Sequence, residues 1–455
     1  MNLLKNTILS LNSIVNNGHK RSVGIKKNIL LSLIVKGFNI LTNLFLVPLT
    51  LAFVTPTEYG IWMTLTSIIG WFSFFDIGLG NGLRNKFAEA VSLGKIQLAK
   101  IYVSTTYAIL IILITGLIIV YFLVNPFVNW AEIFNCKQIT DNRLSALVTI
   151  TFLFFCSQFI LQIISTILTA NHEPAKSSLI SFFGNVLTLI SIYTIHNSTS
   201  GNLLKLTVVL GLCPVIALLV STLYFYNTTY KEYMPSIKWV RFKYTKNLMN
   251  VGVKFFVIQI AFIVLYQTNN IIIVQKFGPI EVTPFNVSYK YFFILPMFFN
   301  IISSPLWSAY TDAWIKKDIK WIEATMRKLH VFFITILIVA GVLIIFSGPI
   351  YSFWIGNTIK IPFALSLSMG IYVLINIWNG IYSQFLNGIG KVKLQLIISI
   401  VGSIINIPLA IFFCNHFGLH GTVLSTIVIS LFGAIIYPIQ FNKIIENKAY
   451  GIWNK

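Results

Sequence analysis

The side chains best placed for chemistry in this sequence are charged residues inside long apolar stretches. There are four of them: Lys36, Asp76, Lys254 and Lys290. A charge at the centre of a membrane-spanning helix costs about 2.5–3.5 kcal/mol on insertion scales, so it usually faces the protein interior or a watery cavity. These residues are therefore candidates for binding ions or charged ligands within the bilayer.

Two of the lysines follow the start of a predicted span. Lys36 lies nine positions after Lys27, which corresponds to about 13 Å along a helix. Its flexible stem allows two interpretations, a lysine that lines a cavity or one that reaches back to the interface. Lys254 occupies the corresponding place in the second half of the chain. Because it is shallower, we favour an interfacial position for Lys254.

Lys290 lies in the aromatic stretch "PFNVSYKYFFILPMFFN", about a turn and a half into a predicted span. Tyr289 and Tyr291 flank it. The pattern fits an aromatic lining around a cationic site and fits equally well an ordinary aromatic belt with a snorkelling lysine. Pro296, in the same span, predicts a bend because it frees a backbone carbonyl.

Asp76 lies near the end of another apolar run, in "FFDIGLGNGLRNKFAEA". The glycines that follow it, Gly78, Gly80 and Gly82, allow close helix approach. Asp76 either anchors this helix end by pairing with a neighbour such as Arg84, or it couples transport to a proton or cation. We favour the anchor, because the sequence offers no second intramembrane acid as its partner.

The composition shows which elements must position these residues. The chain has 455 residues, of which 56% are hydrophobic and only 10% charged, whereas soluble proteins carry roughly 25% charged residues. Apolar stretches long enough to cross about 30 Å of hydrocarbon recur along its whole length. The sequence predicts an all-α polytopic membrane protein with twelve spans: 28–54, 60–82, 101–124, 145–170, 177–196, 203–226, 249–275, 284–308, 329–352, 362–386, 394–415 and 419–441.

The charge distribution predicts the orientation and excludes nucleic acid as a partner. The formal net charge is +21, but the lysines and arginines cluster in alternate short segments between spans, as the positive-inside rule expects for cytoplasmic loops. Both termini are therefore predicted in the cytoplasm. The predicted organisation is an interfacial N-terminal segment 1–27, six-helix bundles 28–228 and 249–442, a cytoplasmic linker 229–248 and a cytoplasmic tail 443–455.

The two halves of the sequence resemble each other at an offset of 223 residues. Pro56 and Glu58 recur as Pro279 and Glu281, and "FAEAVSLGKI" (87–96) aligns with "YTDAWIKKDI" (310–319) without a gap. A repeat with an even number of spans keeps the same orientation in both halves. Transporters built from such repeats hold their substrate near the bilayer midplane, between the halves.

The sequence contains no pattern of an enzyme, a cofactor site or a metal site. It has no phosphate-binding glycine motif with its lysine and no nucleophile motif. The four cysteines, Cys136, Cys156, Cys213 and Cys414, are scattered without metal-ligand spacing. No catalytic residue, cofactor or metal is therefore expected.

Three stretches carry a resemblance to a known family. "TPTEYGIWMTLTSIIGWFSFFDIGLGNGLRNKFAEA" (55–90) resembles the start of Wzx-type polysaccharide-biosynthesis flippases, which belong to the multidrug/oligosaccharidyl-lipid/polysaccharide exporter (MOP) superfamily. "NGIGKVKLQLIISIVGSIINIPLAIFF" (387–413) and "FGLHGTVLSTIVIS" (417–430) are similar to the last two helices of that family. In its span pattern, the resemblance covers nearly the whole chain.

The resemblance implies two six-helix bundles of the MATE-like fold in the bacterial inner membrane. It implies an oligosaccharide linked to undecaprenyl diphosphate as substrate, membrane lipid as surroundings and other polysaccharide-assembly proteins as possible partners. Relatives use basic cavity residues for the diphosphate, a role that Lys36 and Lys290 fit. The alternatives are a cation-coupled multidrug antiporter on the same fold, and a membrane glycan polymerase or ligase, for which the predicted outer loops are too short.

Overall fold

The computed structural model describes residues 20–72, 79–136, 139–171, 173–198, 201–245, 267–303 and 306–454. Within these ranges all regular elements are helices. The first half contains α2 (Lys20–Phe53), α3 (Pro56–Gly70), α4 (Leu79–Ser92), α5 (Ile96–Val124), α6 (Trp130–Ile133), α7 (Asp141–Leu161), α8 (Ile163–Ala170), α9 (Pro174–Ser198) and α10 (Leu203–Asn227). The second contains α12 (Pro279–Phe292), α13 (Ile294–Ser303), α14 (Leu306–Ile315), α15 (Ile319–Ile345), α16 (Ser347–Ile355), α17 (Phe363–Gly388), α18 (Lys393–Phe417) and α19 (Gly421–Ile445).

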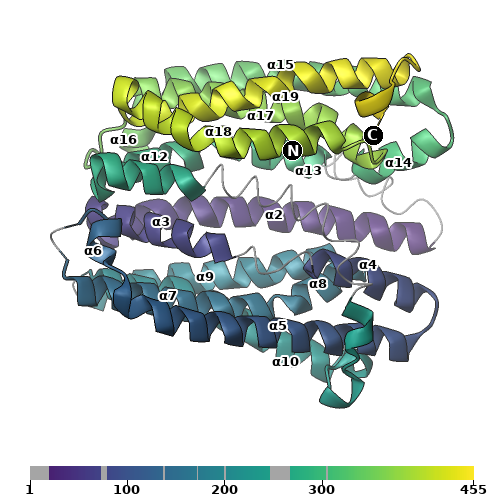
Figure 1. Cartoon of the computed structure of the whole chain (residues 1–455), viewed down its shortest axis with the longest axis horizontal. Coiled ribbons are helices and arrows are strands. Elements are labelled where there is room, and N and C mark those ends of the chain that lie inside the picture. The colour runs from purple at the N-terminus through teal and green to yellow at the C-terminus, as the bar shows by residue number, and fades with distance from the viewer. Residues whose placement is uncertain are drawn as a thin grey trace, which may run out of the picture.

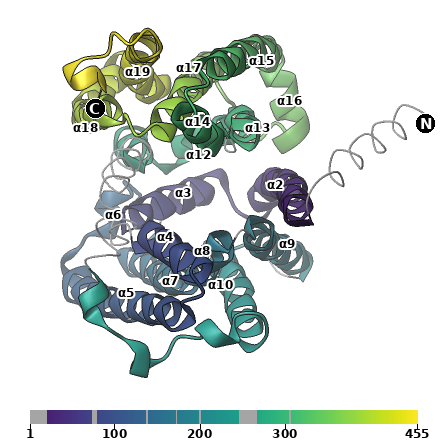
Figure 2. The same ribbon diagram turned by 90° about the vertical axis from the view of Figure 1, so that its right-hand side faces the viewer.

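The long helices run side by side along the long axis of the molecule and form two groups. Helices α3 to α10 lie on one side, α12 to α19 on the other, and α2 lies beside both (Figures 1 and 2). Following the predicted orientation, we call the end at which α3 and α12 begin the outer end and the opposite end the inner end. The residue boundaries of the two predicted bundles remain predictions.

Most of the predicted spans coincide with long apolar helices. Within the described ranges, eight stretches are long and apolar enough to cross a membrane, and one of them, Lys393–Ile445, contains both α18 and α19. The predicted spans 60–82, 249–275 and 284–308 are not among these stretches. Each of those three includes residues outside the described ranges.

The 223-residue repeat is confirmed by where the helices begin. Helices α3 and α12 begin at Pro56 and Pro279, and α5 and α15 begin at Ile96 and Ile319. The turn before each long helix also repeats: Gly94 has φ +68° and its counterpart Lys317 has φ +57°. A left-handed residue at the same place, although only one of the two is glycine, indicates that the turn geometry is retained in both halves.

The predicted bend near Pro296 is present. Helix α12 ends at Phe292 and α13 begins at Ile294. Because Pro296 has no N–H, it cannot bond the carbonyl of Phe292, and the helical ladder is interrupted there. The first half has a similar interruption at Gln162, between α7 and α8, but there no proline accounts for it.

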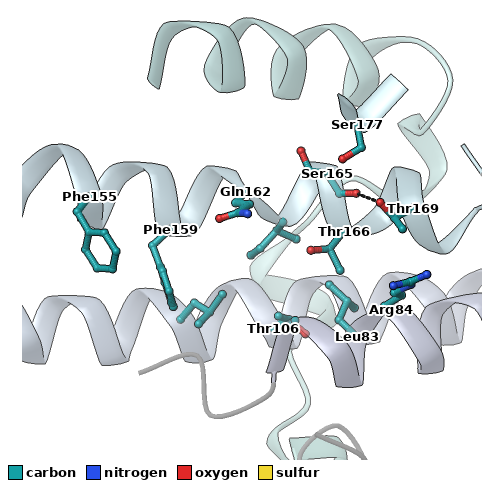
Figure 3. A pocket seen from close by; sticks show the side chains of 13 residues that line it. Leu83, Arg84, Thr106, Phe155, Phe159, Gln162, Ser165, Thr166, Thr169 and Ser177 are labelled. Carbon is teal, nitrogen blue, oxygen red and sulfur yellow. Dashed lines mark hydrogen bonds between the residues drawn. The ribbon is translucent and has the colours of Figure 1, made fainter. Parts of the chain in front are cut away.

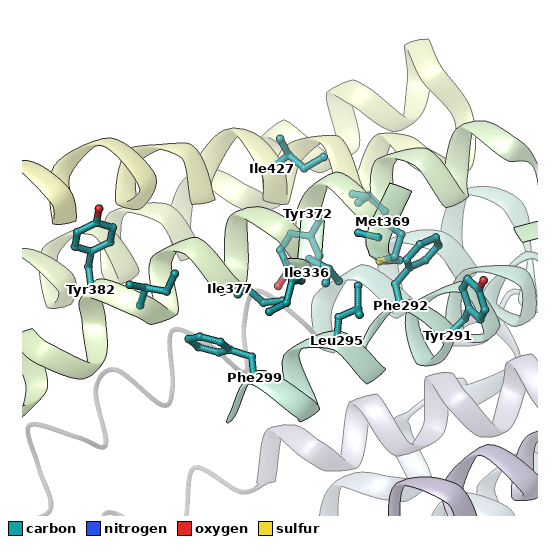
Figure 4. Close-up of a cluster of buried hydrophobic side chains, with 14 of the residues drawn as sticks. Tyr291, Phe292, Leu295, Phe299, Ile336, Met369, Tyr372, Ile377, Tyr382 and Ile427 are labelled. Carbon is teal, nitrogen blue, oxygen red and sulfur yellow. The ribbon is translucent and has the colours of Figure 1, made fainter. Parts of the chain in front are cut away.

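The two halves have separate hydrophobic cores. The core of the second half is rich in aromatic side chains, and Figure 4 shows ten of its residues labelled: Tyr291, Phe292, Leu295, Phe299, Ile336, Met369, Tyr372, Ile377, Tyr382 and Ile427. Val47 of α2 packs into this core as well. Helix α2 therefore contacts the second half although it belongs in sequence to the first.

Candidate functional site

The two halves meet at the outer end through α3 and α12. A Cβ atom added to Gly60 would lie 1.7 Å from the carbonyl oxygen of Pro279, so the two backbones are in direct contact there. The hydroxyl of Thr283 donates to the carbonyl of Pro56. Since Thr283 and Pro279 are the repeat counterparts of Gly60 and Pro56, the contact is made twice, once in each direction.

Side chains next to this contact tie the outer end together further. The amide of Asn135, just after α6, donates to the carbonyls of Val274 and Gln275 at 3.3 Å. The amide of Gln275 donates in return to the carbonyls of Glu132 and Ile133, at 3.0 and 2.6 Å. These bonds satisfy carbonyls at the end of α6 and join the two halves.

Lys290 bridges the two halves beneath the outer contact. Helix α12 begins at Pro279, five residues before the predicted span. Lys290 therefore lies about 16 Å, or about three turns, from the start of the helix, whereas the sequence predicted about a turn and a half. Its ammonium group donates to the hydroxyl of the buried Tyr59 at 2.9 Å and lies 5.5 Å from the centroid of that ring. Lys290 therefore reaches an aromatic partner on the opposite half.

A chain of buried polar side chains continues the interface into the apolar region. Asn270 donates to the hydroxyl of Ser67 at 2.7 Å, and Asn286 donates to Asn270 at 2.9 Å. Asn270 and Asn286 also line a cavity of about 140 Å³, together with Asn269, whose Oδ1 has no hydrogen-bond partner in the described part of the chain. Buried amides that are incompletely satisfied provide acceptors for a ligand or water.

A larger cavity lies inside the first half, toward the inner end. Its volume is about 460 Å³. Its polar lining consists of one cation, five hydroxyl groups and one amide: Arg84, Thr106, Ser165, Thr166, Thr169, Ser177 and Gln162. Figure 3 shows Gln162 and Thr166 on one side of the cavity and Thr106 and Arg84 on the other. A guanidinium group surrounded by hydroxyl groups suits an anionic, oxygen-rich ligand.

Arg84 lines this cavity from α4, which extends past the end of the predicted span. The predicted span ends at residue 82, but α4 continues to Ser92. Arg84 thus lies about 12 Å from the inner end of that helix. Within the described residues, its guanidinium group remains without an acidic partner.

A network at the inner end fixes the turn between α8 and α9, beside the cavity. The carboxylate of Glu173 accepts hydrogen bonds from Lys176 at 2.7 Å and from the hydroxyl of Tyr230 at 2.8 Å. Asn171 donates to the same hydroxyl at 2.9 Å. Burial raises the pKa of the Tyr230 phenol, and its hydrogen bond to Glu173 raises it further. Tyr230 therefore stays neutral at physiological pH and donates a hydrogen bond to Glu173.

The remaining predicted site residues, Lys36, Asp76 and Lys254, either lie away from the two cavities or fall outside the described residues. Lys36 is half-buried on α2 and lines neither of the two cavities above. Asp76 and Lys254 lie outside the described residues. The proposed pairing of Asp76 with Arg84 is thus untested, and the roles of all five predicted residues remain predictions.

The amides at the interface were missed in the sequence. The signal for them was present: "QTNN" (267–270) places four polar residues together in a predicted span, and Asn286 interrupts the next one. Polar residues inside a membrane span face the protein interior more often than lipid. Within the described residues, no group of histidine, cysteine or acidic side chains could hold a metal ion.

This arrangement is that of a multi-pass membrane transporter, and comparisons with known proteins agree. The family model described as MatE matches residues 256–412. A Salmonella typhi protein named "Putative O-antigen transporter" is 22% identical over 408 residues, which cover 85% of this chain and 89% of the relative. A Yersinia pseudotuberculosis protein named "Putative O-antigen export protein" is 21% identical, with coverages of 74% and 76%.

Solved structures show the same fold. An inward-facing multidrug-resistance MATE transporter of the MOP superfamily has a TM-score of 0.73 at 13% identity, and the match covers 93% of this chain and all of that one. An outward-facing MATE transporter of the same superfamily gives 0.66 at 13% identity, with coverages of 93% and 96%. The chain thus contains a region that matches the MatE model and has the fold of these transporters. The predictions of the family, of the twelve-helix MATE-like fold and of a transporter rather than an enzyme are confirmed.

Proposed function

We propose that the protein flips an oligosaccharide linked to undecaprenyl diphosphate, such as an O-antigen repeat unit, across the bacterial inner membrane. Both termini face the cytoplasm in this proposal, so the inner end receives the substrate and the outer end releases it. The relatives named O-antigen transporter and export protein support this substrate class. Their names do not specify the sugars.

The observation that carries the proposal is the Arg84 cavity. At about 460 Å³ it has room for a sugar or a diphosphate, and its hydroxyl and amide groups can replace the water that a sugar loses on leaving the cytoplasm. Arg84 supplies a cation that can bind a phosphate through two N–H groups. The polyprenyl tail has no need of such a cavity, because it can stay in the surrounding lipid.

The contacts at the outer end fit a state that accepts substrate from the cytoplasm. Alternating access then requires α3 and α12 to separate at Gly60 and Pro279 so that the outer end opens. Lys290 and Tyr59 would part in the same movement. The ammonium group of Lys290 would thereby become free to bind a phosphate on its way outward. Lys36 and Lys254 are proposed as further basic contacts along this path.

The test is to replace Arg84→Gln and measure surface glycan in a flippase-deficient strain at matched expression. Glutamine keeps the polar character but removes the charge. A charge-assisted hydrogen bond contributes roughly 1.5–3 kcal/mol, so we expect export to fall by about ten-fold or more.

The matched control is Arg327→Gln. Arg327 is also exposed near the inner end, but it belongs to the second half and lines a different cavity. Export by this variant should stay within about two-fold of the wild type. Wild-type export by Arg84→Gln, or equal losses in both variants, would remove the Arg84 cavity from the mechanism.

The fold also fits a second function, that of a multidrug antiporter. The solved MATE transporters support this alternative, and the 140 Å³ cavity includes aromatic side chains, Phe285, Tyr289 and Tyr372, that suit a flat drug. Efflux of ethidium from cells expressing the protein, with no rescue of surface glycan, would favour the antiporter over the flippase.

A further inference from the structure

The segment that joins the two halves, residues 228–245, lies along the outside of the first half. It contains three short 3₁₀ turns: η3 (Lys231–Tyr233), η4 (Ile237–Trp239) and η5 (Phe242–Tyr244). In Figures 1 and 2 it is the teal segment that follows α10 and passes over the inner part of α5. We call this segment the strap.

Backbone hydrogen bonds fasten the strap to α5. The N–H of Ser236 donates to the hydroxyl of Ser104 at 3.1 Å, and the N–H of Arg241 donates to the hydroxyl of Thr105 at 3.0 Å. Arg241 also closes a turn within the strap, because its guanidinium donates to the carbonyls of Lys238 and Val240. The strap is thus held in a defined conformation and is bound to the first half.

Aromatic side chains form the face of the strap that packs on the bundle. Tyr233 packs edge-on against Phe87, with ring centroids 5.1 Å apart, and Tyr244 packs edge-on against Tyr102 at 5.6 Å. Tyr233 and Tyr244 therefore face the bundle, and the opposite face of the strap points outward.

Apolar side chains project from that opposite face. Ile237 is 92% exposed, Phe242 57% and Met234 48%. Three exposed lysines stand among them, Lys231, Lys238 and Lys243. In the described part of the chain, no acidic group forms an ion pair with any of the three. Glu232 is the only acidic residue of the strap, so the face is cationic as well as apolar.

The attachment points set the depth of the strap. Ser104 and Thr105 lie eight and nine residues after the start of α5 at Ile96, which is about 12–13 Å along the helix. The continuous apolar part of α5 begins just beyond, at 108–124, "AILIILITGLIIVYFLV". From this pattern we expect the strap to lie level with the boundary between hydrocarbon and headgroups. Apolar side chains with flanking lysines are typical of segments that lie in that boundary.

We propose that the strap is a docking surface for anionic phospholipid of the adjacent leaflet. Met234, Ile237 and Phe242 would insert among the upper acyl carbons, and Lys231, Lys238 and Lys243 would contact the phosphates. The charge of this face favours anionic over zwitterionic lipid. The inference rests on the predicted depth of the helices in the bilayer but not on the identity of the transported substrate.

The experiment places a polarity-sensitive fluorophore on the strap. Ile237→Cys is labelled with nitrobenzoxadiazole after purification; the four native cysteines are all buried and should react little. The protein is reconstituted into phosphatidylcholine vesicles with or without phosphatidylglycerol. We expect a blue-shifted emission and at least a two-fold intensity gain when phosphatidylglycerol is present, and loss of that gain at high salt because of screening.

Two variants make the result specific. Adding Lys231→Gln, Lys238→Gln and Lys243→Gln to the labelled protein should abolish the response to phosphatidylglycerol. Among the described residues, no hydrogen bond is donated by these three ammonium groups, so an unchanged melting temperature in detergent is expected as a check. Phe353→Cys, 94% exposed on α16 near the outer end, serves as the labelled control and should not respond to lipid charge.

The proposal is overturned if the strap label gives the same spectrum with and without phosphatidylglycerol. It is also overturned if the label at 353 responds equally, or if only added polyprenyl diphosphate produces the shift. None of these readings requires transport. Lipid docking by the strap and export of glycan are measured independently. Failure of one proposal therefore does not imply failure of the other.

Discussion

The two halves share a framework of helices but fill it differently. At the repeat offset of 223, three cavity-lining residues of the first half, Arg84, Gln162 and Ser165, correspond to Trp307, Phe385 and Gly388. Phe385 is fully buried and packs against Tyr310, Trp314 and Phe441, with ring centroids 5.5, 6.1 and 5.0 Å apart. Where the first half is hollow and polar, the second is filled with aromatic rings.

A glycine makes this dense packing possible. A Cβ atom on Gly388 would lie 2.8 Å from the carbonyl oxygen of Trp307, and the carbonyl of Gly388 accepts a hydrogen bond from Thr311 at 2.7 Å. Ser165 replaces this glycine in the first half and lines the cavity instead. The difference teaches that a duplicated fold can keep a polar cavity in one copy and fill the corresponding place with aromatic side chains in the other.

The largest effect is expected from removing the aromatic packing of the second half. Phe385→Ala should lower the free energy of unfolding by about 3–5 kcal/mol, since it leaves a cavity in a dense core. The repeat counterpart Gln162→Ala, in a site that is already hollow, should cost less than about 1 kcal/mol. Thermal unfolding of the purified variants in detergent compares the two. Equal losses would mean that the halves are packed alike.

A second variant disturbs the contact between the halves. Gly60→Val places side-chain atoms where the carbonyl of Pro279 lies, so the outer end cannot close as described. We expect glycan export to fall more than about ten-fold, equivalent to about 1.4 kcal/mol or more. Cysteines introduced near the outer end should also become more accessible to a membrane-impermeant thiol reagent.

The repeat counterpart of this contact, between Thr283 and Pro56, provides the control. Thr283→Val keeps the shape of the side chain and removes only its hydrogen bond to the carbonyl of Pro56. A loss of about 0.5–1.5 kcal/mol is expected for such a bond, so export should fall several-fold at most. If Gly60→Val exports normally, the close approach of α3 and α12 is not required for the transport cycle.

The smallest effect concerns the starts of the two paired helices. Thr55 caps α3 in a reciprocal capping box with Glu58, whereas Gly278, at the same place before α12, provides no side-chain cap. Thr55→Ala should therefore destabilise the first half by about 1 kcal/mol. Gly278→Ala is also expected to destabilise the protein, but for another reason. Gly278 has φ +86°, a backbone conformation that is unfavourable for a residue with a Cβ atom. Thr55→Ala combined with Glu58→Ala should cost little more than Thr55→Ala alone; additive losses would argue against a reciprocal box.

The helical framework was predictable because it depends on local patterns. Apolar length predicted most of the spans, and the recurrence of Pro56 and Glu58 as Pro279 and Glu281 predicted the repeat. The match of 87–96 to 310–319 predicted a repeat, and the structure contains the same turn in both copies, at Gly94 and Lys317. Such features depend on a few neighbouring residues, so a single sequence is sufficient to find them.

The cavity and the interface were not predictable in the same way. The predicted span ended at residue 82, before Arg84, whereas the helix that carries Arg84 continues to Ser92. The contact of Gly60 with Pro279 joins residues more than two hundred positions apart. A polar cavity arises from the gaps that several helices leave between them, and hydropathy along one chain does not encode those gaps. Of the three lysines singled out in apolar runs, Lys290 contacts the opposite half, Lys36 lines neither cavity, and Lys254 lies outside the described residues.

The contact between α3 and α12 has the form of an isologous dimer interface, in which each partner offers the same patch to the other. Gly60 against Pro279 and Thr283 against Pro56 are the two copies of one interaction. A six-helix chain with this patch could assemble with a second copy of itself and close in the same manner. Fusion into one polypeptide would then have freed each patch to change alone, which accounts for a glycine on one side and a threonine on the other.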